Sequence, residues 1–254
     1  MDTNNKSKYW DIIFFRFKNL YYPPTLIREK DETFIKLFEE IKNKVILKTD
    51  LFEEAHGNKN LLFKLERKNN CVGIDISNAV VNAAKKHSKN SLLINCDVTN
   101  LPFDNESFDI IISTSTLDHI MYEDIIKSLK ELNRVLKKNG RIFLTIDNYH
   151  NLLYRIEFVF WKIFNLYYRS KCFRISEIIE LTKNADLKVK NIKTIMVFPA
   201  IIDKILILVQ NIFKIDLNEA FEKMLILYKK FTKIYKYTSG RFIFVELVKD
   251  NYVK

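Results

Sequence analysis

Short apolar runs alternate with helix-like segments through the middle of the chain, residues 44–147. Each run has the length of a strand, and the later ones are rich in Ile, Leu and Phe, as in strands that are buried on both faces. The five runs are VILKTD (45–50), CVGIDIS (71–77), SLLINCD (91–97), FDIIIST (108–114) and GRIFLTID (140–147). Helices are expected between them at 58–68, 78–90 and 122–140.

The candidate helix at 122–140 has the clearest periodicity. Its apolar residues Ile125, Leu129, Leu132 and Leu136 fall on one stripe, and Gly140 is expected to end it. Strands that alternate with helices predict an α/β fold, a Rossmann-like doubly wound sheet with right-handed crossovers. Two later strand candidates, 187–198 and 240–249, predict a final hairpin-like pair and therefore an antiparallel last strand.

The flanking segments are helical and unusually apolar. Residues 1–43 are aromatic and broken at Tyr22-Pro23-Pro24, which predicts an N-terminal helical cap. Residues 44–254 form the main domain, with helical insertions at about 151–169 and about 199–237. These helices are either a lid packed on the core or an apolar surface for a lipophilic acceptor, with peripheral membrane contact left open.

Composition narrows the class of protein. Hydrophobic residues make up 48% of the 254, and the formal charge is +11. The Lys residues are spread along the chain without a compact basic cluster, so a nucleic-acid partner is not favoured. Three separated cysteines give no zinc or disulfide pattern, and we expect no metal site. No segment reads as a signal peptide or spanning helix, which predicts a cytoplasmic protein; the oligomeric state is not indicated.

Acidic residues close the first three strand candidates. In an open parallel sheet, ligands bind outside the carboxyl ends of the strands. Asp50, Asp75 and Asp97 lie there, about one strand-helix unit apart. An acid that ends the second strand can accept both hydroxyls of a ribose, and one after the third can accept from an adenine amine. A single acid at such a place is more often a helix N-cap or a solvated loop residue, but three in register predict a nucleoside site.

Several stretches together resemble class I S-adenosylmethionine-dependent methyltransferases, in particular the quinone and small-molecule branch. They are VGIDISNAVVNAAKKHS, NCDVTNLPFDNESFDIIISTSTLDHI and LKELNRVLKKNGRIFLTIDN. The resemblance covers about residues 45–148 and implies S-adenosylmethionine as cofactor and a small acceptor methylated at O or C. It implies that Asp75, with Ile76, holds the ribose, that Asp97 and Val98 frame the adenine, and that Ser113 opens the loop past the methionine part.

The first strand leads into a loop that is poor in glycine. Members of the resembled family have an acid and a Gly-x-Gly-x-Gly turn here, and this chain has Asp50 in the place of the acid and Gly57 in that of the last glycine. Glu53 or Glu54 could pair with the positive groups of the cofactor. We read the loop as remodelled; the alternative is a non-catalytic module of the same fold that has lost the cofactor.

Catalytic candidates follow the fourth and fifth strands. His119 and Asp118 are the candidates for a base, although a histidine at this place is equally a packing residue. Asp147, Asn148 and His150 are candidates for the substrate pocket, and Asn148 could equally cap a helix. The alternative activity is RNA methylation, which is suggested only by the positive net charge of the chain.

Overall fold

The computed structural model of the 254-residue chain describes most of the core. The described residues are 3–17, 34, 36–57, 61–152, 154–156, 159, 171–195, 208–209, 212–214, 219, 223, 226–227, 230 and 240–250. Of the expected helical parts, residues 18–33, 160–170 and most of 199–237 lie outside these, so the domain boundaries remain predictions. Among the described residues, no helix is long and apolar enough to cross a membrane.

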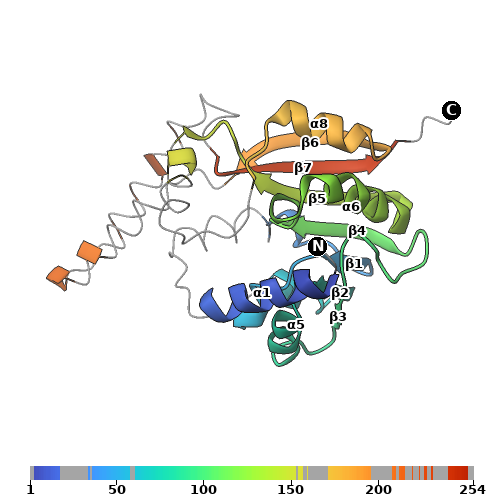
Figure 1. Cartoon of the computed structure of the whole chain (residues 1–254), viewed down its shortest axis with the longest axis horizontal. Coiled ribbons are helices and arrows are strands. Elements are labelled where there is room, and N and C mark those ends of the chain that lie inside the picture. The colour runs from blue at the N-terminus through green and yellow to red at the C-terminus, as the bar shows by residue number, and fades with distance from the viewer. Residues whose placement is uncertain are drawn as a thin grey trace.

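The described strands form one seven-stranded sheet in the order β3-β2-β1-β4-β5-β7-β6. Their bounds are β1 Val45–Lys48, β2 Asn70–Asp75, β3 Leu92–Asn95, β4 Phe108–Thr114, β5 Leu136–Asp147, β6 Leu187–Ile195 and β7 Phe242–Lys249. The pairs among β1 to β5 are parallel, whereas β7 runs antiparallel to both β5 and β6. The strand order reverses between β1 and β4, and the expected α/β fold with an antiparallel last strand is confirmed (Figure 1).

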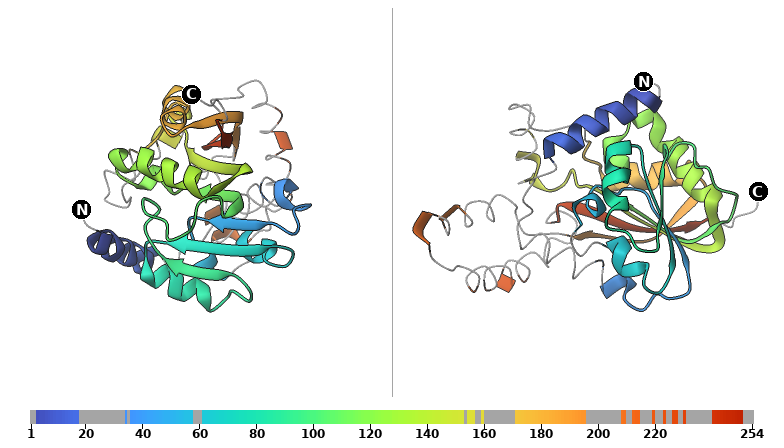
Figure 2. Two further views of the ribbon diagram at one scale, coloured as in Figure 1. Left: turned by 90° about the vertical axis from the view of Figure 1, so that its right-hand side faces the viewer. Right: turned by 90° about the horizontal axis from the view of Figure 1, so that it is seen from below.

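Helices cover both faces of the sheet. Helices α6 (Tyr122–Val135) and α8 (Ile175–Lys183) lie side by side and pack with one set of buried strand residues. Helices α1 (Thr3–Phe17), α4 (Leu61–Leu65) and α5 (Asn78–Lys85) pack with the other set, together with α3 (Lys36–Phe38). Both views of Figure 2 show α1 beside α5, so the N-terminal helix is part of the described core.

The end of α6 differs from the expectation. The helix ends at Val135, and β5 begins at once with Leu136, paired with Phe108. Gly140 therefore lies inside the strand. A Cβ there would come within 2.6 Å of the Leu136 side chain and 3.0 Å of the Asp109 carbonyl oxygen, so the glycine allows close approach beside a register shift in β4. Sequence reasoning took a strand glycine for a helix stop.

Candidate active site

Carboxylates gather where the parallel strands end. Asp75 is the last residue of β2 and Asp147 of β5. Asp50, Asp97 and Asp118 lie a few residues beyond β1, β3 and β4. Because strands in a parallel sheet end at one edge, all five belong to the edge at which such folds bind ligands. The row predicted from three acids is thus found among the described residues, and it continues to the two later strands.

Asp75 is held by backbone groups on both sides. Its Oδ1 accepts from the Ser77 N–H at 2.8 Å, and its Oδ2 accepts from the Leu51 N–H at 3.0 Å. Burial raises the pKa of Asp75 to about 7, the Asp50 charge adds to this, and the two N–H groups and Lys48 oppose it. The backbone of Ile76 also has a partner, since its carbonyl oxygen accepts from the Asn95 side chain at 2.8 Å. The carboxylate is therefore fixed in orientation while each oxygen keeps a lone pair for a ligand.

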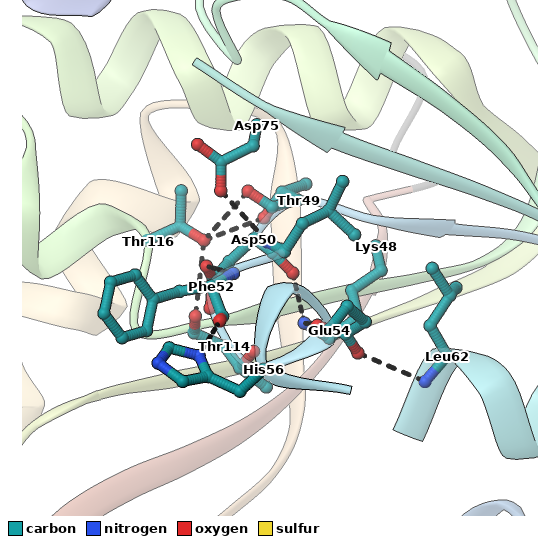
Figure 3. Close-up of polar contacts among 11 residues, drawn as sticks. Lys48, Thr49, Asp50, Phe52, Glu54, His56, Leu62, Asp75, Thr114 and Thr116 are labelled. Atoms are coloured by element: carbon teal, nitrogen blue, oxygen red, sulfur yellow. Dashed lines mark hydrogen bonds and ion pairs between the residues drawn. The ribbon is translucent and has the colours of Figure 1, made fainter. Parts of the chain in front are cut away.

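The loop after β1 is built on a buried ion pair (Figure 3). The Lys48 Nζ lies 2.9 Å from Glu54 Oε2, and these side chains are 1% and 0% exposed. The Lys48 ammonium also donates to the Asp50 carbonyl oxygen, while Glu54 Oε1 accepts from the Leu62 N–H at 3.3 Å. Burial opposes a charged lysine, but Glu54 and Asp50 outweigh it and raise the pKa of Lys48. Glu54 therefore has the lysine as its partner and does not point at the edge.

Gly57 ends the short 3-10 helix η2 (Glu54–His56) with a φ of 76°. A Cβ at this position would come within 2.5 Å of the His87 ring. A glycine is thus required by both the left-handed backbone and the close packing. These local demands explain why the loop's one glycine stands here, next to a histidine and not beside the acids of the strand ends.

Hydroxyl groups join the first and fourth strand ends. The Thr49 Oγ1 donates to the Ser113 Oγ at 2.9 Å and lies 2.9 Å from the Thr116 Oγ1. Ser113 is 1% exposed, so its side chain ties β4 to the loop after β1. Where the sequence predicted a serine beside the methionine part of the cofactor, the structure places it in this bridge between the two central strands.

Each carboxyl oxygen of Asp97 has a partner of its own. Its Oδ1 accepts from the Thr99 N–H at 2.9 Å, and its Oδ2 lies 3.4 Å from the Lys6 Nζ. Lys6 makes a shorter ion pair, 2.8 Å, with Asp124, and the two carboxylates raise the pKa of Lys6 against the effect of burial. Val98 beside it is 6% exposed and belongs to the core on the α6 and α8 face.

Helix α1 brings further side chains to the same edge. The Asp11 Oδ1 accepts from the Ser77 Oγ at 2.6 Å and from the Ala79 N–H at 3.0 Å, at the start of α5. The Trp10 ring meets the His119 ring edge-on at 5.5 Å. The described part of the N-terminal cap thus makes contacts from the end of β3 to the segment after β4.

Asp118 is the most unusual group of the site. It lies in the 3-10 helix η3 (Leu117–His119), is 1% exposed, and neither of its carboxyl oxygens has a hydrogen-bond partner among the described residues. Burial raises its pKa to about 7; the neighbouring His119 lowers it, while Asp147 raises it. Asp147 itself accepts from the Tyr154 hydroxyl at 2.8 Å. A buried carboxyl without a donor is costly and is a typical sign of function.

The three pocket candidates after β5 separate in the structure. Asp147 is 2% exposed and close enough to Asp118 to shift its pKa. Asn148 is fully buried, where its amide donates to the Gly240 carbonyl oxygen at 2.8 Å and its Oδ1 accepts from the His150 N–H at 2.9 Å. His150 is exposed. The structure therefore places Asp147 with the acids, whereas the Asn148 side chain links the end of β5 to the segment before β7.

Sequence reasoning missed several residues of this site. Lys48 and Lys6 form ion pairs with acids of the site, and Asp11 accepts from the Ser77 hydroxyl. Thr49 and Tyr154 supply hydroxyl partners. A signal for Lys48 existed, since a lysine inside an apolar strand needs a buried counterion. No comparable signal existed for Lys6 and Asp11, because their partners lie 91 and 66 residues away along the chain.

Comparisons with known proteins agree with this geometry. Residues 55–144 match the family model of the methyltransferase domain. Over 229 residues the chain is 25% identical to an uncharacterised protein of Methanocaldococcus jannaschii, which covers 89% of this chain and 87% of that protein. A stretch of 73 residues is 38% identical to the demethylmenaquinone methyltransferase of Staphylococcus haemolyticus and covers 28% of this chain and 30% of that enzyme.

The fold has solved counterparts. Magnesium protoporphyrin IX methyltransferase from Synechocystis, with bound S-adenosylhomocysteine, superposes with a TM-score of 0.58 at 14% identity, over 75% of this chain and 92% of that one. A methyltransferase domain model thus matches residues 55–144, and the fold is shared with S-adenosylmethionine-dependent methyltransferases of known structure. The domain match confirms the methyltransferase resemblance stated from the sequence, and this resemblance implies S-adenosylmethionine as the cofactor.

The residues present fit this cofactor. S-adenosylmethionine carries a sulfonium and an ammonium group, and the edge offers several carboxylates to such charges. Asp75 keeps free lone pairs while its orientation is fixed by two backbone N–H groups. The contact between Lys6 and Asp97 is the longer of the two that Lys6 makes, so Asp97 is the carboxylate that this lysine holds more weakly.

Proposed function

We propose that the protein methylates a small lipophilic acceptor at an oxygen or carbon atom, with Asp118 as the base. The observation that carries this proposal is the buried Asp118 carboxyl, which has no donor in the part of the chain that the structure describes and lies at the strand end after the proposed cofactor residues. A base works best when its pKa lies near the working pH, and burial raises the pKa of Asp118 to about 7. His119 is the second base candidate, and its contact with Trp10 also suits a packing role.

The proposed reaction needs alignment and one proton acceptor. When bound, S-adenosylmethionine would supply the methyl group, which would pass from its positively charged sulfur to the acceptor atom and leave a neutral thioether. The proton that the acceptor loses goes to a carboxylate oxygen of Asp118. Asp75 holds the ribose and Asp97 the adenine amine, while Asp50 adds negative charge near Asp75. Asp147 keeps Asp118 basic through charge repulsion.

Exposed apolar side chains support a lipophilic acceptor. Met121 and Tyr122, directly after η3, are 45% and 49% exposed, and Leu152 and Ile156, after β5, are 64% and 61% exposed. Both groups follow strand ends that carry Asp118 and Asp147. Large exposed apolar residues beside a polar site are typical of a surface that receives an apolar ligand. The relative from Staphylococcus haemolyticus is named for demethylmenaquinone, an acceptor of this kind.

Two experiments test the proposal. Calorimetric titration with S-adenosylhomocysteine should show binding that Asp75→Ala abolishes and that the exposed control Asp104→Ala keeps. Transfer of labelled methyl groups is then compared for prenylated hydroquinones, their short-chain analogues and total RNA. We expect labelling of the prenylated compounds and its loss in Asp118→Asn. Labelling of RNA alone, in line with the charge of +11, would support the alternative activity and contradict the lipophilic acceptor.

A further inference from the structure

The loop after β1 lacks the glycines that would let its backbone lie close to a ligand, yet it runs past Asp75. It achieves its conformation with two fully buried charges, Lys48 and Glu54, whose atoms lie 2.9 Å apart. A buried ion pair seldom adds stability over apolar residues of the same size, so its presence calls for another reason. Figure 3 shows the Lys48 and Glu54 side chains turned toward each other, with Asp50 beside Lys48.

The contacts of the pair lead to Asp75. Lys48 donates to the Asp50 carbonyl oxygen, and the next residue, Leu51, donates its N–H to Asp75 Oδ2 at 3.0 Å. One carboxyl oxygen of Glu54 accepts from the Lys48 ammonium and the other accepts from the Leu62 N–H. The second contact anchors the ion pair to the start of α4. The ion pair thus fixes the backbone at residues 50–51, and this backbone orients the Asp75 carboxylate.

We propose that Lys48 and Glu54 are positioning residues that replace the glycine turn: they hold the loop so that Asp75 is oriented and charged to accept the cofactor ribose. The inference rests on the proposed role of Asp75. Lys48 acts through the loop and through its charge, and Glu54 acts by keeping Lys48 in place. Neither residue touches the cofactor.

The charge effect gives the inference a specific signature. The groups that face Asp75 are Lys48, Asp50 and Cys96. Burial first and Asp50 second raise the pKa of Asp75 to about 7, and Lys48 opposes them. Ribose hydroxyls donate to the ionised carboxylate, so affinity should fall as the pH drops below this range. Removal of the Lys48 charge raises the pKa of Asp75 further and moves the midpoint of binding to higher pH.

The test is calorimetric titration of S-adenosylhomocysteine between pH 5.5 and 8.5 with three proteins. The double variant Lys48→Met with Glu54→Gln removes both charges and leaves no buried charge unpaired, so it should fold, as thermal unfolding will show. The matched control is Lys137→Met with Asp109→Asn, an ion pair of 3.0 Å on β5 and β4. We expect at least tenfold weaker binding and a midpoint at higher pH in the first variant, and neither change in the control.

The outcomes separate the two proposals. Absence of binding by the unmodified protein refutes the cofactor role of Asp75, and the inference falls with it. Binding by the unmodified protein together with an unchanged midpoint in the double variant overturns the inference alone. If the double variant does not fold, Glu54→Gln alone is used: it keeps an acceptor for Leu62 but removes the charge that holds Lys48 in place, so binding should weaken and its midpoint should move to higher pH. A shift to lower pH, or none, overturns the inference.

Discussion

Replacement of Asp118 by Asn is expected to stabilise the protein at alkaline pH while it removes methyl transfer. The carboxyl is 1% exposed and lacks a hydrogen-bond donor among the described residues. Its neighbours are His119, Asp147, Asp50 and the Cys172 thiol. Of these, only His119 favours a negative charge on Asp118. An amide of the same shape cannot ionise, so the cost of the buried charge disappears.

The size of the effect follows from the pKa of Asp118, about 7 in the folded protein. A carboxyl whose pKa is raised on folding favours the folded state at low pH, and this contribution is lost as the pH rises from about 4 to about 7. Because the carboxyl ionises more easily in the unfolded chain, linkage lowers the free energy of unfolding by about 1.5 kcal/mol at pH 5 and about 4 kcal/mol at pH 8. The buried amide has its own cost, but that cost is the same at both pH values and cancels in the difference.

The measurement is urea unfolding of the unmodified protein and Asp118→Asn at pH 5 and pH 8. The stability gained by the substitution should be larger at pH 8 by about 2.5 kcal/mol. The exposed Asp104→Asn serves as control and should give the same small change at both pH values. Equal effects of Asp118→Asn at the two pH values would refute the reasoning, because the carboxyl would then ionise as easily in the folded as in the unfolded chain.

Three further substitutions test the packing around the site. Gly57→Ala should cost about 1–3 kcal/mol in thermal unfolding, since the backbone is left-handed and the His87 ring fills the space; a smaller loss would contradict both reasons. Ser77→Ala removes the N-cap of α5 and a partner of Asp11, and should lower the stability by about 1 kcal/mol in the same measurement. An unchanged stability would show that the cap does not stabilise the protein. Lys6→Met should cost no more than about 1 kcal/mol, because its ion pairs are partly exposed, but should speed proteolysis within α1; unchanged cleavage would argue against docking by Lys6.

The parallel part of the sheet could be predicted from the sequence because its strands are short apolar runs, with helical segments after the first, second and fourth. The antiparallel pair at 187–195 and 242–249 was also correctly expected. Errors arose where local pattern and tertiary structure disagree. Gly140 looks like a helix stop, yet it serves the close approach of β5 to β4, which depends on a neighbouring strand and not on the residues beside it.

The site was predictable to the extent that it follows from strand ends. Asp50, Asp75 and Asp97 were expected to lie together because parallel strands place such residues at one edge. Their partners were not, since Lys6 reaches Asp97 and Asp124 across 91 and 118 residues of chain. The role of Glu54 depended on Lys48, and a sequence shows two opposite charges near each other without showing that both point inward.

The acidic edge also bears on the kind of acceptor. The chain as a whole carries a charge of +11, whereas the described strand ends present Asp50, Asp75, Asp97, Asp118 and Asp147. Phosphates are repelled by such an edge, so RNA attracted to basic surface elsewhere should not enter it. We expect RNA to bind with steep salt dependence and without displacing S-adenosylhomocysteine. The check is calorimetric titration of the cofactor product with and without a saturating RNA duplex at 50 mM and 200 mM salt. Competition at low salt would place phosphates at the carboxylates and would exclude an acceptor site selected for uncharged molecules.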